Sequence, residues 1–259
     1  MSDEPVLYER DGHVATITYN RPEKLNAING ALRQALNAAW ETFRDDEDAW
    51  VAIVTGAGKA FCVGADLHDG AGAAGTWAGS FWEIPTVNSF ESGMEIWKPT
   101  IAAVHGYCLG YGLTAVSACD FVIAADDAQF GMPEVRLGSP TIVGAMRLPG
   151  RVGMQPALEL LLTGDRIDAA RAKEIGLAGW VVPRADLMTE ARRLADRLCQ
   201  GAPLAVRAVK EMAHRGQALP WVDAVRMGET MRRVVLATDD AAEGMAAARE
   251  GRPPEWTGR

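Results

Sequence analysis

The chain has 259 residues, 48% of them hydrophobic and 23% charged, which suits one α/β domain with a small additional helical part. Its formal net charge is -8 and no basic cluster stands out, so nucleic acid is disfavoured as a partner. No apolar run approaches the roughly 18 residues that a transmembrane helix needs, so no membrane association is predicted.

The cysteines and histidines indicate a reducing compartment and no metal site. Cys62, Cys108, Cys119 and Cys199 show no CxxC spacing, and the histidines form no HExxH pair. We interpret the cysteines as reduced, mostly buried thiols. The first residues, MSDEPVLYERDG, lack the apolar segment of a secretory signal. The sequence therefore predicts a cytoplasmic protein without a metal ion.

Strand and helix patterns alternate through the first part of the chain. Residues 15–19 alternate between apolar side chains and threonine, and residues 51–55 form an apolar run, so both predict strands. Between them, Asn26 is a plausible cap for a helix. Arg21 and Lys24 beside it would most often be solvated surface charges. Apolar residues at helical spacing then predict one buried face, made of Ile28, Leu32, Leu36, Trp40 and Phe43.

A glycine-containing connection, GAGKAFCVGADL, follows the second strand. It does not match GxxxxGK[ST], which disfavours a phosphate-loop NTPase. The next stretch, Asp69 to Glu83, is rich in glycine and alanine and carries Trp77, Phe81 and Trp82. Two interpretations stay open for it: a mobile segment that caps an apolar pocket, or a surface loop whose aromatic rings pack on the core.

The stretch from Ile101 to Glu134 organises the rest of the chain. It predicts a buried strand at 101–104, a glycine-rich turn around Gly110, a helix at 113–119 and a strand at 121–123. The start of a helix presents unpaired N–H groups and can hold a developing negative charge. Glu134 brings a carboxylate back after the second strand. We therefore predict an oxyanion site that faces one glutamate.

The second half reads mainly as helices. The residues from 135 to 153 show turn residues and little periodicity. Asp168 offers a helix cap, and Gly176 a helix stop. The expected elements are helices at 156–162 and 169–175, a strand at 180–182, and helices at 186–200, 203–214, 221–236 and 239–249.

In combination and in this order, these turns resemble the crotonase superfamily, which includes enoyl-CoA hydratases and isomerases. The resemblance implies an α/β fold, a crotonase-like spiral of ββα repeats followed by a C-terminal helical region. It implies a core over residues 1–200 and a helical trimerisation region over 201–259, in a homotrimer or a dimer of trimers. The matching stretches are 20–28, 55–67, 103–120, 128–138, 163–177, 243–244 and 252–253.

The resemblance also implies an acyl-CoA thioester as the ligand, with coenzyme A as part of the substrate and no separate cofactor. The thioester oxygen would accept hydrogen bonds from the main-chain N–H groups of Ala65 and Tyr111. The family often has glycine at the second position, so the Tyr111 ring could narrow the pocket. The positions implied to contact coenzyme A are Lys24, Ala27, Ala65, Asp66 and Leu67.

One departure from the family pattern bears on the reaction. Two-glutamate hydratases carry a carboxylate where this chain has Thr114, while Glu134 matches the second carboxylate. A threonine hydroxyl can orient a water molecule but is no base near neutral pH. Moving a double bond needs only one carboxylate to carry a proton between two carbons, which slightly favours a Δ3-Δ2 enoyl-CoA isomerase.

Two alternatives remain open. One is a hydratase or hydratase-lyase that uses Glu134 with a water oriented by Thr114. The other is a catalytically inactive protein that binds a CoA thioester. For Glu134 itself the alternative is structural, because a carboxylate after a proline such as Pro133 is often only a surface turn residue.

Overall fold

The computed structural model describes residues 4–68 and 89–259 of the chain, and within them the strands form two sheets. The larger sheet has the order β1-β2-β3-β4-β6-β9; β1 is antiparallel to β2, and the other neighbouring pairs are parallel. The smaller sheet has the order β5-β7-β8. The strands are β1 Val6–Asp11, β2 Val14–Tyr19, β3 Val51–Gly56, β4 Thr100–Val104, β5 Tyr107–Leu109, β6 Phe121–Ala125, β7 Gln129–Gly131, β8 Arg166–Asp168 and β9 Trp180–Val182.

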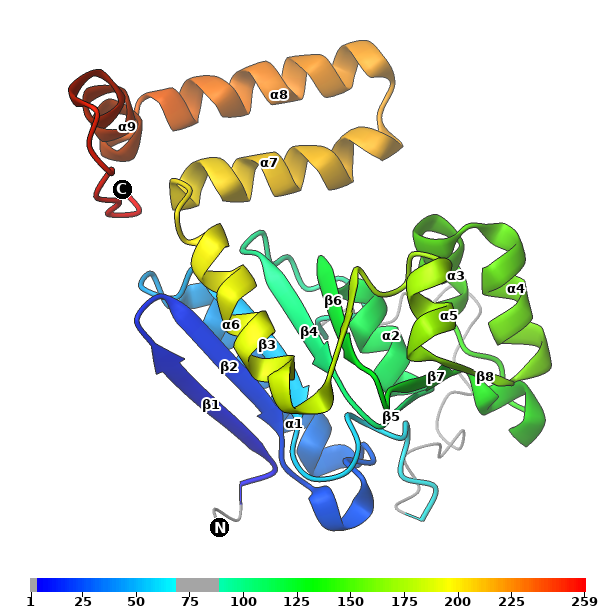
Figure 1. The fold of residues 1–259 in the computed structure, drawn as a ribbon. Coiled ribbons are helices and arrows are strands. Elements are labelled where there is room, and N and C mark those ends of the chain that lie inside the picture. The colour runs from blue at the N-terminus through cyan, green and yellow to red at the C-terminus, as the bar shows by residue number, and fades with distance from the viewer. Residues whose placement is uncertain (1–3, 69–88) are drawn as a thin grey trace.

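Helices cover both faces of the larger sheet. Helix α1 packs on β1 and β2, whereas α6 packs on β3, β4 and β6 and lies across the front face in Figure 1. The α-helices are α1 Gly30–Asp45, α2 Tyr111–Ala118, α3 Val143–Val152, α4 Met154–Thr163, α5 Ala169–Glu174, α6 Leu187–Leu198, α7 Pro203–Arg215, α8 Trp221–Leu236 and α9 Asp239–Glu250. Short 3-10 helices include η1 Pro22–Lys24 and η2 Pro133–Leu137.

The central strands are apolar along their whole length because both faces are covered. Every residue of β3 and β4 is buried. Alternate side chains enter different clusters: Val54 faces the core on the α1 side, while Ile53 and Ile101 pack with Leu187 and Leu194 of α6. This alternation follows from the two-residue repeat of a strand and explains why the parallel strands read as continuous apolar runs.

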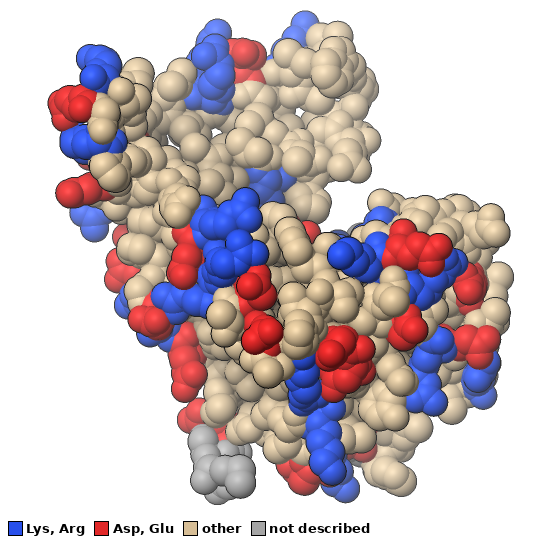
Figure 2. Space-filling view, in the orientation of Figure 1, with Lys and Arg blue, Asp and Glu red and all other residues tan. Residues whose placement is uncertain are grey.

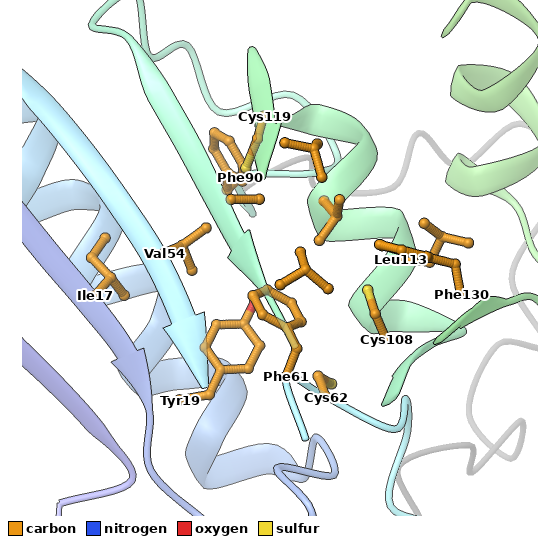
Figure 3. Close-up of a cluster of buried hydrophobic side chains, with 14 of the residues drawn as sticks. Ile17, Tyr19, Val54, Phe61, Cys62, Phe90, Cys108, Leu113, Cys119 and Phe130 are labelled. Atoms are coloured by element: carbon orange, nitrogen blue, oxygen red, sulfur yellow. The ribbon is translucent and has the colours of Figure 1, made fainter. Parts of the chain in front are cut away.

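The core on the α1 side reaches the start of α2. Figure 3 shows the rings of Tyr19 and Phe61 side by side, with centroids 5.3 Å apart, and Leu113 of α2 beyond them. All three residues are at most 1% exposed. The first turn of α2 therefore rests on rigidly packed side chains.

Several expectations about individual elements need correction. The helix begins at Gly30, capped by Asn29, whose side chain accepts a hydrogen bond from the N–H of Leu32; Asn26 is not its cap. The irregular stretch after Glu134 contains α3, which has Pro149 in its interior and whose pattern is interrupted by glycines. The three-residue strands β5, β7 and β8 were too short to show a repeat. The expected aromatic cap at 69–83 lies outside the described residues.

Helices α7, α8 and α9 follow the sheet-covering helix α6 and stand above the sheets in Figure 1. Helix α7 packs against α8, and α8 against α9. No residue of α8 is buried, and Trp221 and Val234 on it are 81% and 67% exposed. Figure 2 shows charges of both signs interspersed over the face seen there, including along the upper edge that α8 forms.

Membrane spans, metal sites and disulfides can also be looked for among the described residues. Among them, no helix is both long and apolar enough to cross a membrane. In the same part of the chain, no group of three or more His, Cys, Asp or Glu side chains is arranged to hold a metal ion. The four cysteines are free thiols, and burial raises the pKa of Cys62 and Cys119 to about 12.

Candidate active site

The turn after β2 is tied to the turn after β3 by one buried asparagine. Asn26 is fully buried, with a left-handed φ of 57°, a conformation that asparagine tolerates better than most residues. Its side-chain nitrogen donates to the carbonyls of Ala57 at 3.0 Å and Ala60 at 2.8 Å, and its oxygen accepts from the N–H of Arg21 at 2.9 Å. Asn26 therefore fixes the position of one turn relative to the other.

The main chain at Gly64 to Asp66 continues this contact as a parallel bridge. The N–H of Ile28 donates to the carbonyl of Gly64 at 2.8 Å, and the N–H of Asp66 donates to the carbonyl of Ile28 at 2.9 Å. Because successive main-chain groups of an extended segment point to opposite sides, the N–H of Ala65 points away from this bridge. Among the described residues, it has no hydrogen-bond acceptor.

A second bridge brings the start of α2 beside Gly64. Cys62 and Cys108 form it, with the N–H of Leu109 donating to the carbonyl of Cys62 at 2.8 Å. Gly64 has φ +97°, and a Cβ added to it would lie 3.2 Å from the carbonyl oxygen of Leu109 and 3.7 Å from the nitrogen of Tyr111. The turn at Gly64 and the turn that opens α2 are thus in direct contact.

Tyr111 is the first residue of α2, and its N–H has no helical partner. Gly110 before it has φ +54° and ψ -118° and provides no side-chain cap. No hydrogen bond within the described part of the chain uses the N–H of Tyr111. The main-chain N–H groups of Ala65 and Tyr111 are therefore uncommitted donors on adjacent turns, in the partial positive field of a helix start.

Glu134 lies against the same turn. It belongs to η2, and a Cβ on Gly110 would lie 2.9 Å from its Oε1 atom. Its Oε2 atom is buried and has no hydrogen-bond partner among the described residues. Burial raises the pKa of Glu134, against an opposing hydrogen bond from its own main-chain N–H. A partly desolvated carboxylate with a free oxygen is a suitable proton acceptor and donor.

Thr114 lies one helical turn after Gly110. Its N–H donates to the carbonyl of Gly110 at 2.9 Å, the first hydrogen bond of the α2 ladder, and the residue is 5% exposed. A Cβ on Gly144 of α3 would lie 3.1 Å from its hydroxyl oxygen. The hydroxyl is therefore held between α2 and α3.

The positions expected to contact coenzyme A divide into two kinds. Ala27 and Asp66 are buried and are joined by Arg21, which donates to the Ala27 carbonyl at 2.6 Å and pairs with the Asp66 carboxylate at 3.3 Å. Lys24 and Leu67 are exposed. Arg21 is therefore not the solvated charge that the sequence suggests. A hydrogen bond from the N–H of His68, and then Arg21, lower the pKa of Asp66 in spite of its desolvation.

One buried carboxylate at this site was not predicted. Glu91 is 6% exposed and accepts a hydrogen bond from the Tyr111 hydroxyl. Burial, and then the charge of Glu91, raise the pKa of Tyr111, so its phenol is neutral near pH 7 and acts as the donor. Nothing in the local pattern indicates this contact, because Glu91 and Tyr111 are 20 positions apart and no motif joins them.

This arrangement defines a class of protein: an α/β enzyme with two adjacent main-chain donors and a partly buried carboxylate beside them. A model of the family "Enoyl-CoA hydratase/isomerase" matches residues 9–259. The chain belongs to this family, which is also called the crotonase family. It is therefore an enzyme of a family whose chemistry takes place on CoA thioesters.

Relatives and solved structures match along nearly the whole chain. A probable enoyl-CoA hydratase of Mycobacterium tuberculosis is 40% identical over 263 residues, covering 100% of both chains. The carnitinyl-CoA dehydratase of Proteus mirabilis is 37% identical, covering 96% of each. The (E)-benzylidenesuccinyl-CoA hydratase of Thauera aromatica is 35% identical, covering 98% of this chain and 99% of the relative. A crystal structure of enoyl-CoA hydratase from Mycobacterium tuberculosis has a TM-score of 0.90 at 34% identity, covering 99% and 100% of the two chains.

Proposed function

We propose that this protein is an enoyl-CoA hydratase, which adds water across the 2,3 double bond of an acyl-CoA thioester or removes it in reverse. The relatives described above are named as hydratases and a dehydratase, which favours hydration over the isomerisation suggested by Thr114 alone. The observation that carries the proposal is the carboxylate of Glu134, with one buried oxygen free of described partners, against the turn that holds Gly110.

The paired N–H groups would stabilise the transition state. The thioester oxygen accepts hydrogen bonds from the N–H groups of Ala65 and Tyr111, and these bonds strengthen as the oxygen becomes an enolate. Removing one donor of this kind typically costs ~10²–10³ in rate. The neighbouring bridges at Ile28 and Cys62 support this role because they hold the two donors at fixed positions.

Glu134 would carry the proton, and Thr114 would orient the water. The carboxylate takes a proton from water while the oxygen of that water bonds to C3 of the enoyl group. The electron pair of the double bond moves to the thioester oxygen as the enolate forms. The enolate then collapses and C2 takes the proton back from Glu134, so that one carboxylate serves both steps. The position of Thr114 supports this proposal, because its residue follows Gly110 by one helical turn and its N–H donates to the Gly110 carbonyl.

Coenzyme A would lie along the turns at Lys24–Ala27 and Ala65–Leu67. Because the Asp66 carboxylate already pairs with Arg21, Asp66 would contribute through its main chain. The exposed Lys24 would meet the phosphates of coenzyme A as a flexible point charge. We also propose that residues 201–259 mediate a homotrimer or a dimer of trimers, since α8 presents exposed apolar side chains such as Trp221 and Val234.

The test compares two substrates. Crotonyl-CoA should lose the absorbance of its conjugated thioester as water adds, whereas a 3-enoyl-CoA should show no gain of that absorbance. A gain with the 3-enoyl substrate alone would establish isomerisation. Binding of crotonyl-CoA without any change in either substrate would support the non-catalytic CoA-binding alternative. Glu134→Gln should slow the hydration by ~10²–10⁴-fold. Glu95→Gln, at an exposed glutamate paired with Arg215, is the matched control.

A further inference from the structure

We propose that Glu91 is a positioning residue, which holds the Tyr111 side chain so that the Tyr111 main-chain N–H stays aimed at the thioester oxygen. This inference rests on the function proposed above for that N–H. It assigns a role to the buried carboxylate of Glu91, which is not part of the family pattern. It also assigns one to the side chain of Tyr111, at a position where the family often has glycine.

This contact acts at the start of α2. Tyr111 opens the helix, so its N–H is not held by an intrahelical hydrogen bond, and Gly110 before it provides no side-chain cap. Gly110 is suited to glycine, since its φ of +54° disfavours other residues and an added Cβ, 2.9 Å from Oε1 of Glu134, would push that carboxylate aside. The Gly110 carbonyl, in the same planar peptide unit as the Tyr111 N–H, accepts from the N–H of Thr114 at 2.9 Å, so the helix holds this peptide on one side. The Tyr111 side chain can add a second constraint from outside the helix.

The side chain of Tyr111 is fixed by residues from two other segments. Its hydroxyl donates to Oε1 of Glu91, and the Arg33 guanidinium of α1 lies 5.2 Å from the centre of its ring. The ring packs against the buried core cluster that includes Tyr19. A tyrosine held at its hydroxyl, at its face and along its ring has little freedom to rotate, and its Cα is constrained with it.

Glu91 is itself fixed to the body of the protein. The Ser89 hydroxyl donates to the same Oε1 atom at 2.5 Å, and the main-chain carbonyl of Glu91 accepts from Nε of Arg147, on α3, at 2.9 Å. Phe90, which lies between Ser89 and Glu91 in the chain, stacks on Trp40 of α1, with ring centroids 4.0 Å apart. The carboxylate thus connects Tyr111 to α1 and α3, and not only to the loop that carries it.

The consequence concerns the rate more than the affinity. A donor that is displaced by a fraction of an ångström loses most in the transition state, where the charge on oxygen is largest, and a 1 Å misplacement can cost about 10²-fold in rate. The ground-state thioester, which carries less charge, is affected less. We therefore expect loss of this contact to lower kcat and leave KM nearly unchanged.

The experiment uses Tyr111→Phe, Glu91→Ala and Glu91→Gln, assayed with crotonyl-CoA. Tyr111→Phe and Glu91→Ala should each lower kcat roughly tenfold, since each removes one charge-assisted hydrogen bond, and the double variant should be no worse than either single one. Glu91→Gln keeps an acceptor oxygen and should retain most of the activity. Glu95→Ala, on the same segment but exposed, should behave as the wild type.

A second measurement needs no turnover. In a Glu134→Gln background, bound cinnamoyl-CoA should show a red-shifted absorbance because the donors polarise its carbonyl. Adding Tyr111→Phe or Glu91→Ala should reduce that shift, and adding Glu95→Ala should not. Unchanged kcat and an unchanged red shift in Tyr111→Phe, which removes a single oxygen, would overturn the proposal, even if the melting temperature falls. If the wild type hydrates no enoyl-CoA, the proposed function fails, and the red shift still decides the role of Glu91.

Discussion

Two partly buried carboxylates, Glu134 and Asp120, have opposite surroundings. Oδ2 of Asp120 accepts from the N–H and hydroxyl of Thr100 at 2.8 and 2.9 Å and pairs with Lys210 of α7 at 2.7 Å. His214 lies 3.5 Å from its other oxygen. Glu134, by contrast, has a buried oxygen with no partner in the described part of the chain.

The pKa directions follow from this difference. Burial alone would raise the pKa of Asp120, but hydrogen bonds from His214 and Lys210 outweigh it, and the pKa is lowered. Burial raises the pKa of Glu134 because only one main-chain hydrogen bond opposes it. A satisfied buried carboxylate holds α7 to the sheet, whereas an unsatisfied one is available for chemistry. The two should therefore respond oppositely to substitution: Asp120 through stability, Glu134 through rate.

The largest effect is expected for Glu134→Gln. We expect kcat for hydration of crotonyl-CoA to fall ~10²–10⁴-fold, the usual contribution of a general acid or base. The free energy of unfolding should not decrease, since the substitution removes a carboxylate that is poorly solvated when ionised. Steady-state kinetics and urea unfolding measure both quantities. A variant that unfolds more easily but turns over normally would show that Glu134 behaves like Asp120.

The next effect tests the space between Gly110 and Glu134. Gly110→Ala should lower kcat roughly 10- to 100-fold, because the new Cβ would displace the carboxylate from its place. Gly12→Ala is the matched control: its φ of +58° is similar, but a Cβ there meets nothing within 4 Å. Gly12→Ala should lose about 1 kcal/mol of stability from its positive φ, and Gly110→Ala should lose more, because its ψ of -118° lies outside the left-handed helical region. Equal kinetics in the two variants would contradict the assigned geometry.

Removing the ion pair between Asp120 and Lys210 should lower the stability of the protein without changing its catalytic rate. Lys210→Met removes the cation beside a carboxylate whose side chain is 13% exposed, so we expect a loss of about 3 kcal/mol in the free energy of unfolding. The kcat per folded molecule should stay near the wild-type value. Lys173→Met, at an exposed lysine of α5, should change neither. Chemical denaturation with parallel kinetics checks this prediction.

A smaller effect is expected at Thr114. Thr114→Val keeps the shape of the side chain but removes the hydroxyl, and the loss of one hydrogen bond to the attacking water should lower kcat about tenfold. The variant should still bind crotonyl-CoA. Stopped-flow absorbance measures the rate, and unchanged hydration would exclude a role for the hydroxyl in orienting water.

The smallest effect is a displacement of the pH profile. The ionised form of Glu134 is the base, and burial raises its pKa, so kcat/KM should fall as the pH drops through a midpoint above the usual value of about 4.3. The profile is measured from below the ordinary glutamate pKa of about 4.3 up to about pH 8, in buffers of constant ionic strength. A limb at or below the ordinary glutamate value would mean that Glu134 is solvated or is not the base.

The strongly patterned elements could be predicted from the sequence. The apolar runs of β3 and β4 and the periodic face of α1 were readable because burial imposes a fixed repeat on them. The cap of α5 was predicted correctly, since the Asp168 side chain accepts from the N–H of Arg171 at 2.8 Å. Helix α3 was missed because Pro149 and its glycines interrupt the pattern.

The candidate site could be predicted only in part. The glycine turns and Glu134 were recognisable as a family pattern, but their contact depends on two isolated bridges, at Ile28 and Cys62, which leave no local periodicity. The contact between Glu91 and Tyr111 was missed for a related reason. A single hydrogen bond between distant segments depends on how α2 and α3 pack, and no spacing in the sequence records that packing.

The most direct test of the central claim is a crystal structure of Glu134→Gln with crotonyl-CoA bound. We predict that the thioester oxygen lies within about 3.1 Å of the main-chain nitrogens of both Ala65 and Tyr111, with the side chain at 134 facing C2 and C3 of the acyl group. A thioester oxygen bound away from these two nitrogens, or a side chain at 134 turned away from the acyl group, would contradict the account.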